Sequence, residues 1–469
     1  MTLKSSTRIA SFVALPLLVT PSAGADDDAP AGEDGIVSIP STPQREGDPQ
    51  AGREYLLYGD YVGSGFPYDI FVELLNAQGG GTPRLERAGR SAPIPHEFNA
   101  FKTPEGVEVV GGFNCLGCHA AEFRGELVIG MGNSFSDWSD AMTPTRDVRL
   151  LIASRYGVKS AEWEASHRLL RGMDATAGFV RTPFAGVNPA FRLEEAAAAH
   201  RRPKDLTWSE ERLFQPTRGV IASDVPPWWH LKKKHALYYT GMGRGDFARL
   251  LQQIGVVGIK DAETAAARTA SMADLLAYIR TLEPPVYPGV IDAGLAAEGE
   301  RVFAANCKRC HGTYGESWTY PNRLVPVSEV GTDGAYAQRL IDSPLTRWFN
   351  ESWFAGEDGT SAGVEPRLAY VAPPLDGVWC TAPYLHNASV PTLDTLLDSS
   401  KRPTYWRRSF DEHDYDLERV GWAYEDVPGA ADASTYDTTR AGYGNHGHTY
   451  GDDLTDEERR ALIEYLKSL

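Results

Sequence analysis

Two short motifs repeat one arrangement of cysteine and histidine. Residues 115–119 (Cys-Leu-Gly-Cys-His) and residues 307–311 (Cys-Lys-Arg-Cys-His) both follow the pattern Cys-x-x-Cys-His. Two thiols one helical turn apart can each form a thioether with a porphyrin vinyl group, while the adjacent imidazole reaches the iron from one side. The motifs therefore predict two covalently attached haems c, held by Cys115, Cys118, His119, Cys307, Cys310 and His311.

Other uses of paired cysteines explain this pattern less well. A redox-active dithiol or a zinc site with four ligands would not need a histidine directly after the second cysteine twice over. The fifth cysteine, Cys380, has no partner once the other four are thioether-bonded. We expect it to be a buried, inert thiol.

The second haem has few candidates for its sixth iron ligand. His119 and His311 take the fifth position by their place in the motifs, and no methionine follows Met272. If this haem takes its sixth ligand from its own domain, that ligand is a histidine, and the candidates are His386, His413, His446 and His448. Two histidine ligands generally give a lower potential than histidine and methionine, which predicts an electron relay.

The first haem has a wider choice. Its part of the chain offers several methionines and the histidines His167, His200, His230 and His235. The sequence does not choose among them, and an iron with an open coordination position is a further alternative. An open iron would carry out peroxide or dioxygen chemistry.

Helices should position the two motifs. Residues 293–306 are rich in helix formers and would deliver Cys307 to its haem. Amphipathic helices with matching apolar spacing close each half, near residues 275–282 and 462–469, and the second opens with the capping box Thr455-x-x-Glu458. The predicted fold class is mainly α, with two cytochrome c-like domains and long irregular loops.

The chain divides into four predicted segments. Residues 1–25 have the basic start, short apolar core and small-residue end of a signal peptide, and residues 26–50 read as a flexible leader. A proline-rich joint near residues 283–289 separates domains over residues 51–285 and 286–469. A stretch from each domain, residues 226–241 and 373–388, aligns without gaps, although identity is low.

These features predict an exported protein, periplasmic or secreted. No segment of the sequence is apolar over the roughly 20 residues that span a bilayer, so we expect no membrane span. The formal net charge of −17 argues against nucleic acid or an anionic membrane as partner.

Residues 381–393 (Thr-Ala-Pro-Tyr-Leu-His-Asn-Ala-Ser-Val-Pro-Thr-Leu) resemble a signature of the di-haem cytochrome c peroxidase superfamily. Ala388 stands where that family usually has glycine. The dipeptides Arg402-Pro and Val420-Gly and the run Gly-His-Thr-Tyr-Gly at residues 447–451 are similar to a subgroup that includes the di-haem rubber oxygenases.

The resemblance implies a division of labour between the haems. His448 would be the distal ligand of the second haem, and His386 a contact of its propionate or pocket. For His446, beside Gly447, a surface position is expected rather than ligation. The first haem would be the reactive centre, splitting peroxide or binding dioxygen. A tryptophan commonly lies between or beside the haems in this family, so Trp228 and Trp229 are candidates, as are Tyr238 and Tyr239 for the distal face of the first haem. Aromatic core packing is an equal alternative for these four.

Three functions follow from these expectations. The first is an oxidoreductase of the peroxidase or dioxygenase type, supplied with electrons by a small redox protein or a small-molecule reductant and acting on peroxide, dioxygen or an organic substrate. The second is a non-catalytic di-haem electron-transfer cytochrome, and the third a haem-based sensor. A calcium ion between the domains is a further candidate cofactor.

Overall fold

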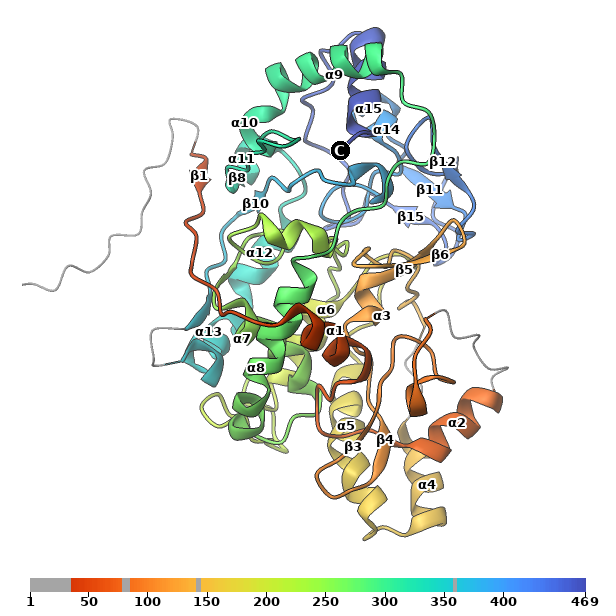
Figure 1. The fold of residues 1–469 in the computed structure, drawn as a ribbon, viewed down its shortest axis with the longest axis vertical. Helices are drawn as coiled ribbons and strands as arrows, with labels where there is room; N and C mark the ends of the chain where they lie inside the picture. The colour runs from red at the N-terminus through yellow and green to blue at the C-terminus, as the bar shows by residue number, and fades with distance from the viewer. Residues whose placement is uncertain (1–34, 78–84, 141–144, 357–360) are drawn as a thin grey trace, which may run out of the picture.

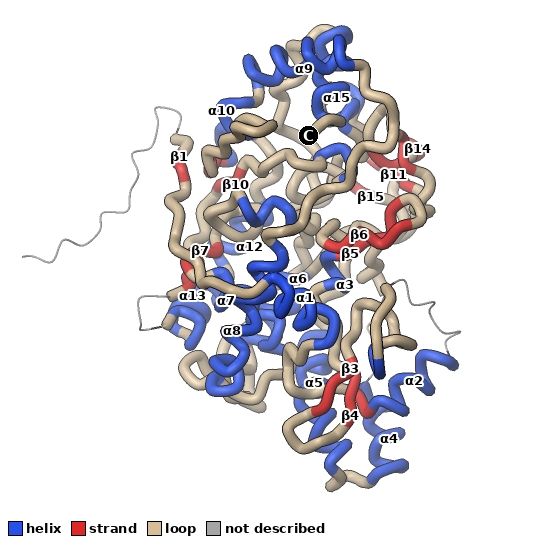
Figure 2. Tube along the Cα trace, viewed as in Figure 1, coloured by secondary structure: helices blue, strands red, loops and turns tan. Residues whose placement is uncertain are grey.

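The computed structural model describes residues 35–77, 85–140, 145–356 and 361–469. The signal peptide predicted for residues 1–25 lies outside these ranges. No helix within the described ranges is both long enough and apolar enough to cross a bilayer. The described chain forms one elongated body, in which helices and short strands are joined by long loops (Figures 1 and 2).

The prediction of a mainly α fold is wrong. The structure is 38% helical and 13% strand, with several small sheets. The α-helices are α1 (Pro49–Tyr58), α2 (Tyr68–Ala77), α3 (Leu116–His119), α4 (Thr145–Tyr156), α5 (Ala161–Ala177), α6 (Ala190–Ala198), α7 (Phe247–Leu251), α8 (Ala262–Ile279), α9 (Ala293–Asn306), α10 (Lys308–His311), α11 (Val327–Val330), α12 (Ala335–Asp342), α13 (Pro344–Glu351), α14 (Leu393–Leu396) and α15 (Asp456–Leu466).

Within the described ranges, the strands form six small antiparallel sheets. Their orders are β1-β8-β10, β14-β11-β15, β2-β4-β3, β12-β13, β5-β6 and β7-β9. The strands are β1 (Val37–Ser38), β2 (Phe66–Pro67), β3 (Ala100–Lys102), β4 (Glu108–Val110), β5 (Ala120–Phe123), β6 (Glu126–Ile129), β7 (Gly243–Gly245), β8 (Arg323–Pro326), β9 (Ala362–Val364), β10 (Ala369–Val371), β11 (Tyr405–Arg408), β12 (Tyr415–Asp416), β13 (Gly421–Trp422), β14 (Tyr424–Asp426) and β15 (Tyr436–Asp437). Strands this short carry too little alternation of apolar and polar residues to be detected in the sequence.

Two pairs of helices repeat one packing arrangement. α1 packs against α8, and α9 packs against α15 at the upper end of the view in Figure 1. Each crossing depends on a glycine, because a Cβ on Gly52 of α1 would overlap the backbone of Asp274, and one on Gly299 of α9 would overlap that of Ala461. The close approach of the helices therefore needs glycine at both positions.

The helices predicted around the second motif are confirmed. α9 covers the segment expected to deliver Cys307, and Asp292 caps its start. The capping box of Thr455 and Glu458 is present at the start of α15. The first motif has no such adjacent helix, because a long insertion separates α1 from α3.

Two large hydrophobic clusters each draw on both sides of residue 285. The cluster around α1 and α8 includes Trp348 and other buried residues of α12 and α13, and α13 lies beside α7 in Figure 1. The cluster around α9 and α15 includes Phe123 of β5 and Trp229. Strand pairing also joins the two sides, since β7 precedes residue 285 and pairs with β9, which follows it. The parts of the chain before and after residue 285 are thus interleaved.

The segment expected to be a flexible leader contains ordered structure. β1 pairs with β8, with Val37 opposite Leu324. The side chains of Ile36 and Ile39 are buried on either side of this strand. Three apolar residues within four positions (36–39) are too weak a signal to outweigh the surrounding proline, glycine and aspartate.

Candidate haem-binding sites

Both Cys-x-x-Cys-His motifs fold into one turn of helix. The backbone N–H of His119 donates to the carbonyl of Cys115, and that of His311 to Cys307, each at 3.0 Å. These bonds put the two cysteines of each motif one turn apart, with the histidine at the end of α3 or α10. None of the five cysteines forms a disulfide. The geometry that thioether attachment requires is therefore present twice.

A proline carbonyl faces the histidine of each motif. His311 Nδ1 lies 2.8 Å from the carbonyl oxygen of Pro373. Burial lowers the pKa of His119 to about 4, and a hydrogen bond with the backbone of Pro226 offsets part of this shift. Pro226 and Pro373 are the first residues of the two segments that align in the sequence. A hydrogen bond from Nδ1 to a carbonyl leaves Nε2 available to bind a metal, as is usual for histidine ligands.

One histidine lies opposite the second motif. The ring centroids of His448 and His311 are 6.3 Å apart. Two imidazoles that share one metal, with each nitrogen about 2 Å from it, have centroids roughly 6.3 Å apart. Burial lowers the pKa of His448 to about 3 and also lowers that of His311, so both rings are neutral and able to bind a metal at neutral pH. The separation fits an iron between the two rings.

The other histidine candidates for this site lie elsewhere. His446 and His413 are exposed. His386 is buried and stacks on Tyr370, with centroids 3.9 Å apart. Its Nε2 has no hydrogen-bond partner among the described residues, as expected for a donor that faces a bound group.

Arg402 holds the loop that carries His448. Its Nη1 donates to the carbonyls of Asn445 (2.6 Å) and Gly447 (2.7 Å), and its Nη2 donates to the carbonyl of His448 (3.2 Å). Two further bonds go to carbonyls of α14. Nε donates to the carbonyl of Thr395 (3.1 Å), and Nη2 also donates to that of Leu396 (2.8 Å). The five N–H groups of the guanidinium are thus all used on main-chain oxygens.

Replacing Arg402 with methionine is expected to destabilise the holo protein by about 2–4 kcal/mol, because it leaves several main-chain carbonyls without their donor. The fraction of low-spin haem should fall as well, since His448 loses its anchor. Lys401→Met is the matched control, because Lys401 makes only surface ion pairs with Asp394 and Asp398. Denaturant unfolding and haem absorbance would measure both effects. Equal stability and equal spectra for the two variants would contradict the role of Arg402.

The first motif has a tryptophan beside it and no second histidine. Trp228 stacks on His119 with centroids 4.8 Å apart and an interplanar angle of 22°. Among the described residues, no histidine ring contacts His119 as His448 contacts His311. The four histidines that the sequence offered as ligands have other partners. His200 contacts the carbonyl of Ser209, His230 that of Asp376, and His235 that of Ile39. His167 lies on α5 near Arg171.

A glutamate on α6 lies near the first motif. The charge of Glu194 raises the pKa values of Cys118, Tyr238 and Tyr336, so these three side chains lie near its carboxyl group. Burial raises the pKa of Glu194 to about 8. Asn188, just before α6, donates from Nδ2 to Cys118 Sγ at 3.2 Å. Glu194 could not be predicted from the sequence, since nothing in its spacing from residues 115–119 relates it to the motif.

The predicted aromatic residues lie in three different settings. Trp228 is the residue stacked on His119. Trp229 is fully buried and donates from Nε1 to the carbonyl of Asp376 at 2.8 Å, three residues after Pro373. Tyr239 donates from its hydroxyl to Asp224 Oδ2 at 2.6 Å. Trp228 and Trp229 therefore extend from the first motif to the segment that contacts His311.

His230 should make stability depend on pH. Burial lowers its pKa to about 4, while in the unfolded chain an ordinary histidine binds a proton below about 6.5. Between these values the unfolded state takes up the proton and the folded state does not, so stability falls as the pH falls. When the pH is lowered from 7 to 4.5, the free energy of unfolding should fall by about 2 kcal/mol less in His230→Gln than in the wild type.

Denaturant unfolding of the holo protein at the two pH values would measure this difference. His413→Gln is the control, because His413 is exposed and should leave the pH dependence as in the wild type. An unchanged pH dependence in His230→Gln would contradict the prediction.

The described residues fit haem better than another metal. No group of three or more histidine, cysteine, aspartate or glutamate side chains gathers there as a metal site. His448 Nδ1 is buried without a partner among the described residues, as is His386 Nε2. Paired thiols, neutral imidazoles and unpartnered donors together suit a haem at each motif.

Comparison with known proteins agrees with part of this interpretation. A family model described as RoxA-like, cytochrome c-like matches residues 369–407, which include Pro373 and His386. Two uncharacterized proteins of Sinorhizobium fredii (strain NBRC 101917 / NGR234) are similar over longer stretches. The protein y4iJ is 31% identical over 253 residues (40% of this chain and 41% of its own length), and y4iM is 28% identical over 294 residues (52% and 64%).

The chain thus covers less than two thirds of either relative. The family match supports the resemblance to rubber oxygenase-type cytochromes over residues 369–407 and implies haem c binding there. The two relatives, being uncharacterized, bring no activity to this chain.

Proposed function

We propose that this protein is an exported c-type cytochrome with two haems, one bound at His119 that activates peroxide or dioxygen, and one bound at His311 and His448 that relays electrons. The observation that carries this proposal is the asymmetry of the two sites. One histidine ring lies opposite His311, whereas no described histidine lies opposite His119. When bound, each haem supplies the redox chemistry of its iron.

Glu194 is the group best placed to move protons at the first site. Its carboxyl group lies near Cys118 and has a pKa of about 8, so both protonation states are accessible near neutral pH. Such a carboxyl can take a proton from a peroxide or return one to a leaving hydroxide. Tyr238 and Tyr336 lie close enough to Glu194 for its charge to raise the pKa of each phenol.

The tryptophan pair supports electron transfer between the sites. Trp228 stacks on His119, and Trp229 binds the segment that contains Pro373, whose carbonyl contacts His311. Ring stacking, two hydrogen bonds and short stretches of backbone thus connect the two motifs. This arrangement suits the passage of electrons from a relay haem to a reactive one.

The remaining parts of the proposal rest on the sequence. Residues 1–25 would direct export to the periplasm or the medium, and the boundary between the cytochrome c-like domains would lie near residue 285. A small redox protein or a small-molecule reductant would supply electrons, and peroxide, dioxygen or an organic substrate would be turned over.

Electron paramagnetic resonance of the oxidised holo protein, with and without cyanide, tests the proposal. We expect one high-spin signal that cyanide converts to low spin, and a second, low-spin signal that cyanide leaves unchanged. Since half-reduction can open a closed site, the spectra should be recorded in both redox states. Two low-spin signals indifferent to cyanide in both states would instead establish an electron carrier. Full turnover in His119→Ala would also refute the proposal.

A further inference from the structure

Asp224 is a half-buried carboxylate whose direct partner is a phenol. The hydroxyl of Tyr239 donates to Asp224 Oδ2 at 2.6 Å. Burial raises the pKa of Tyr239 well above its ordinary value, and the charge of Asp224 raises it further. The backbone N–H of Asp224 donates to the carbonyl of His386 at 2.8 Å, which fixes the main chain beside the pair. The mechanism above leaves this pair unused.

We propose that Tyr239 and Asp224 form a redox-active pair, in which Tyr239 loses one electron while its phenolic proton moves to Asp224. The O–H bond of Tyr239 breaks, an O–H bond forms on Asp224 Oδ2, and the electron reduces a one-electron oxidant. The products are a neutral tyrosyl radical and a carboxylic acid. When an electron returns, the proton goes back to the phenolate oxygen.

The proposal does not depend on the function proposed above, because any one-electron oxidant of sufficient potential can take the electron. A peroxide-treated haem protein would be such an oxidant. The pair is well placed for it, since Asp224 precedes Pro226 by two residues and the backbone of Pro226 faces His119.

Loss of an electron makes a phenol strongly acidic, so oxidation of a buried tyrosine is easiest where a base can accept its proton at once. Tyr238, the neighbour in sequence, lacks such a base in its hydrogen bond, because its hydroxyl accepts from Gln253 Nε2 at 2.8 Å. Tyr156 does donate to a carboxylate, that of Asp69, but Asp69 is exposed and also pairs with Arg155. The pKa of Asp69 is lowered, which makes it a weaker proton acceptor than Asp224.

The charged and titratable groups that face Asp224 leave its carboxylate free to accept a proton. Burial raises the pKa of Asp224 to about 7, while Tyr239, the backbone of Val225 and the charge of Arg408 lower it. Tyr436 also faces this carboxylate and feels its charge. No salt bridge of Asp224 occurs among the described residues, since Arg408 donates to Ser134 instead.

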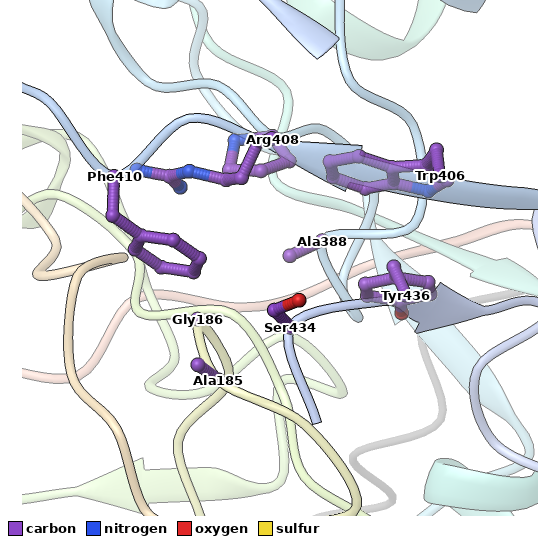
Figure 3. Close-up of a pocket in the computed structure, with 9 residues that line it drawn as sticks. Ala185, Gly186, Ala388, Trp406, Arg408, Phe410, Ser434 and Tyr436 are labelled. Atoms are coloured by element: carbon purple, nitrogen blue, oxygen red, sulfur yellow. The ribbon is translucent and has the colours of Figure 1, made fainter. Parts of the chain in front are cut away.

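Aromatic rings enclose the guanidinium group of Arg408, which makes no salt bridge with Asp224. Its guanidinium carbon lies 4.3 Å from the ring centroid of Trp422 and 4.7 Å from those of Phe135 and Phe410. Arg408 and Phe410 line a small hollow together with Trp406 and Tyr436, as Figure 3 shows. The arginine therefore tunes Asp224 through space without occupying its oxygen atoms.

The test uses the holo protein with two oxidants, hydrogen peroxide and a photogenerated ruthenium(III) tris-bipyridine complex, followed by rapid freezing and electron paramagnetic resonance. We expect a tyrosyl radical with ruthenium(III) that is retained in Tyr238→Phe and Tyr156→Phe and lost in Tyr239→Phe. Asp224→Asn keeps an oxygen acceptor but removes the base, so the radical yield should fall about tenfold or more. In the wild type the yield should also fall about tenfold for each pH unit below 7, because Asp224 is then protonated.

The two oxidants separate this proposal from the proposed function. A Tyr239 radical with ruthenium(III) but not with peroxide would support the redox pair and count against a peroxide-activating haem. A radical with both oxidants supports both proposals. A radical that persists in Tyr239→Phe, or an Asp224→Asn variant with the yield and pH dependence of the wild type, would overturn the redox pair.

Discussion

Replacing Glu194 with glutamine is expected to slow the reaction of the holo protein with hydrogen peroxide by about 10²–10⁴-fold, the usual contribution of a positioned general base. The carboxylate would accept the proton of peroxide beside Cys118, and glutamine cannot. Only the ionised form is a base, so the wild-type rate should rise with pH up to about 8, the pKa of Glu194. Glu194→Gln should lose this rise together with the rate.

Stopped-flow absorbance of the haem bands would measure this reaction between pH 5 and 9. Glu164→Gln is the control, because Glu164 is an exposed residue of α5 and should react as the wild type does. Glu195 is less suitable, since it is buried, binds Arg192 and accepts a hydrogen bond from Ser343, so its loss would act through folding. A Glu194→Gln variant with the wild-type rate and pH profile would exclude Glu194 from proton transfer.

Local sequence signals predicted the parts of the sites that are local in the structure. The Cys-x-x-Cys-His turns, α9 and the cap of α15 all depend on residues within a few positions of one another. The alignment that pairs Pro226 with Pro373 also held useful information, because both backbones face a motif histidine. The role of each proline became visible only with the fold.

Contacts between distant segments could not be predicted in the same way. Glu194 comes close to Cys118 only because α6 packs beside the first motif, and its Ala-rich surroundings read as an ordinary helix. The mainly α prediction failed for a related reason, since the short strands form where distant loops meet, as in the pairing of Gly243 with Val364. Such pairings depend on the whole fold and carry little local periodicity.

The interleaving of the two halves bears on how the sites can communicate. α12 and α13 of the C-terminal half pack among the helices of the first, while β5 follows the first motif directly and packs in the second cluster. Each motif is therefore supported by residues from both halves. A change at one site should be felt at the other through this shared core more readily than through a flexible hinge.

Replacing His448 with methionine is expected to raise the reduction potential of the second haem by on the order of 100 mV or more, because methionine in place of histidine favours the reduced iron. His448 is the expected ligand because its ring lies 6.3 Å from that of His311, a separation that fits two imidazoles on one iron. His448→Ala should go further and convert the low-spin signal of this haem to a high-spin one. Redox titration and electron paramagnetic resonance would measure the two changes.

His446→Ala is the matched control, since His446 lies in the same loop but is exposed and should leave spin state and potential unchanged. If the low-spin signal survived in His448→Ala and disappeared in the corresponding variant of His386, the ligand would be His386 and the assignment of His448 would be wrong. Survival in every single variant would mean that the second iron takes a ligand from outside these histidines. Loss in His448→Ala alone would establish His448 as the sixth ligand of the second haem.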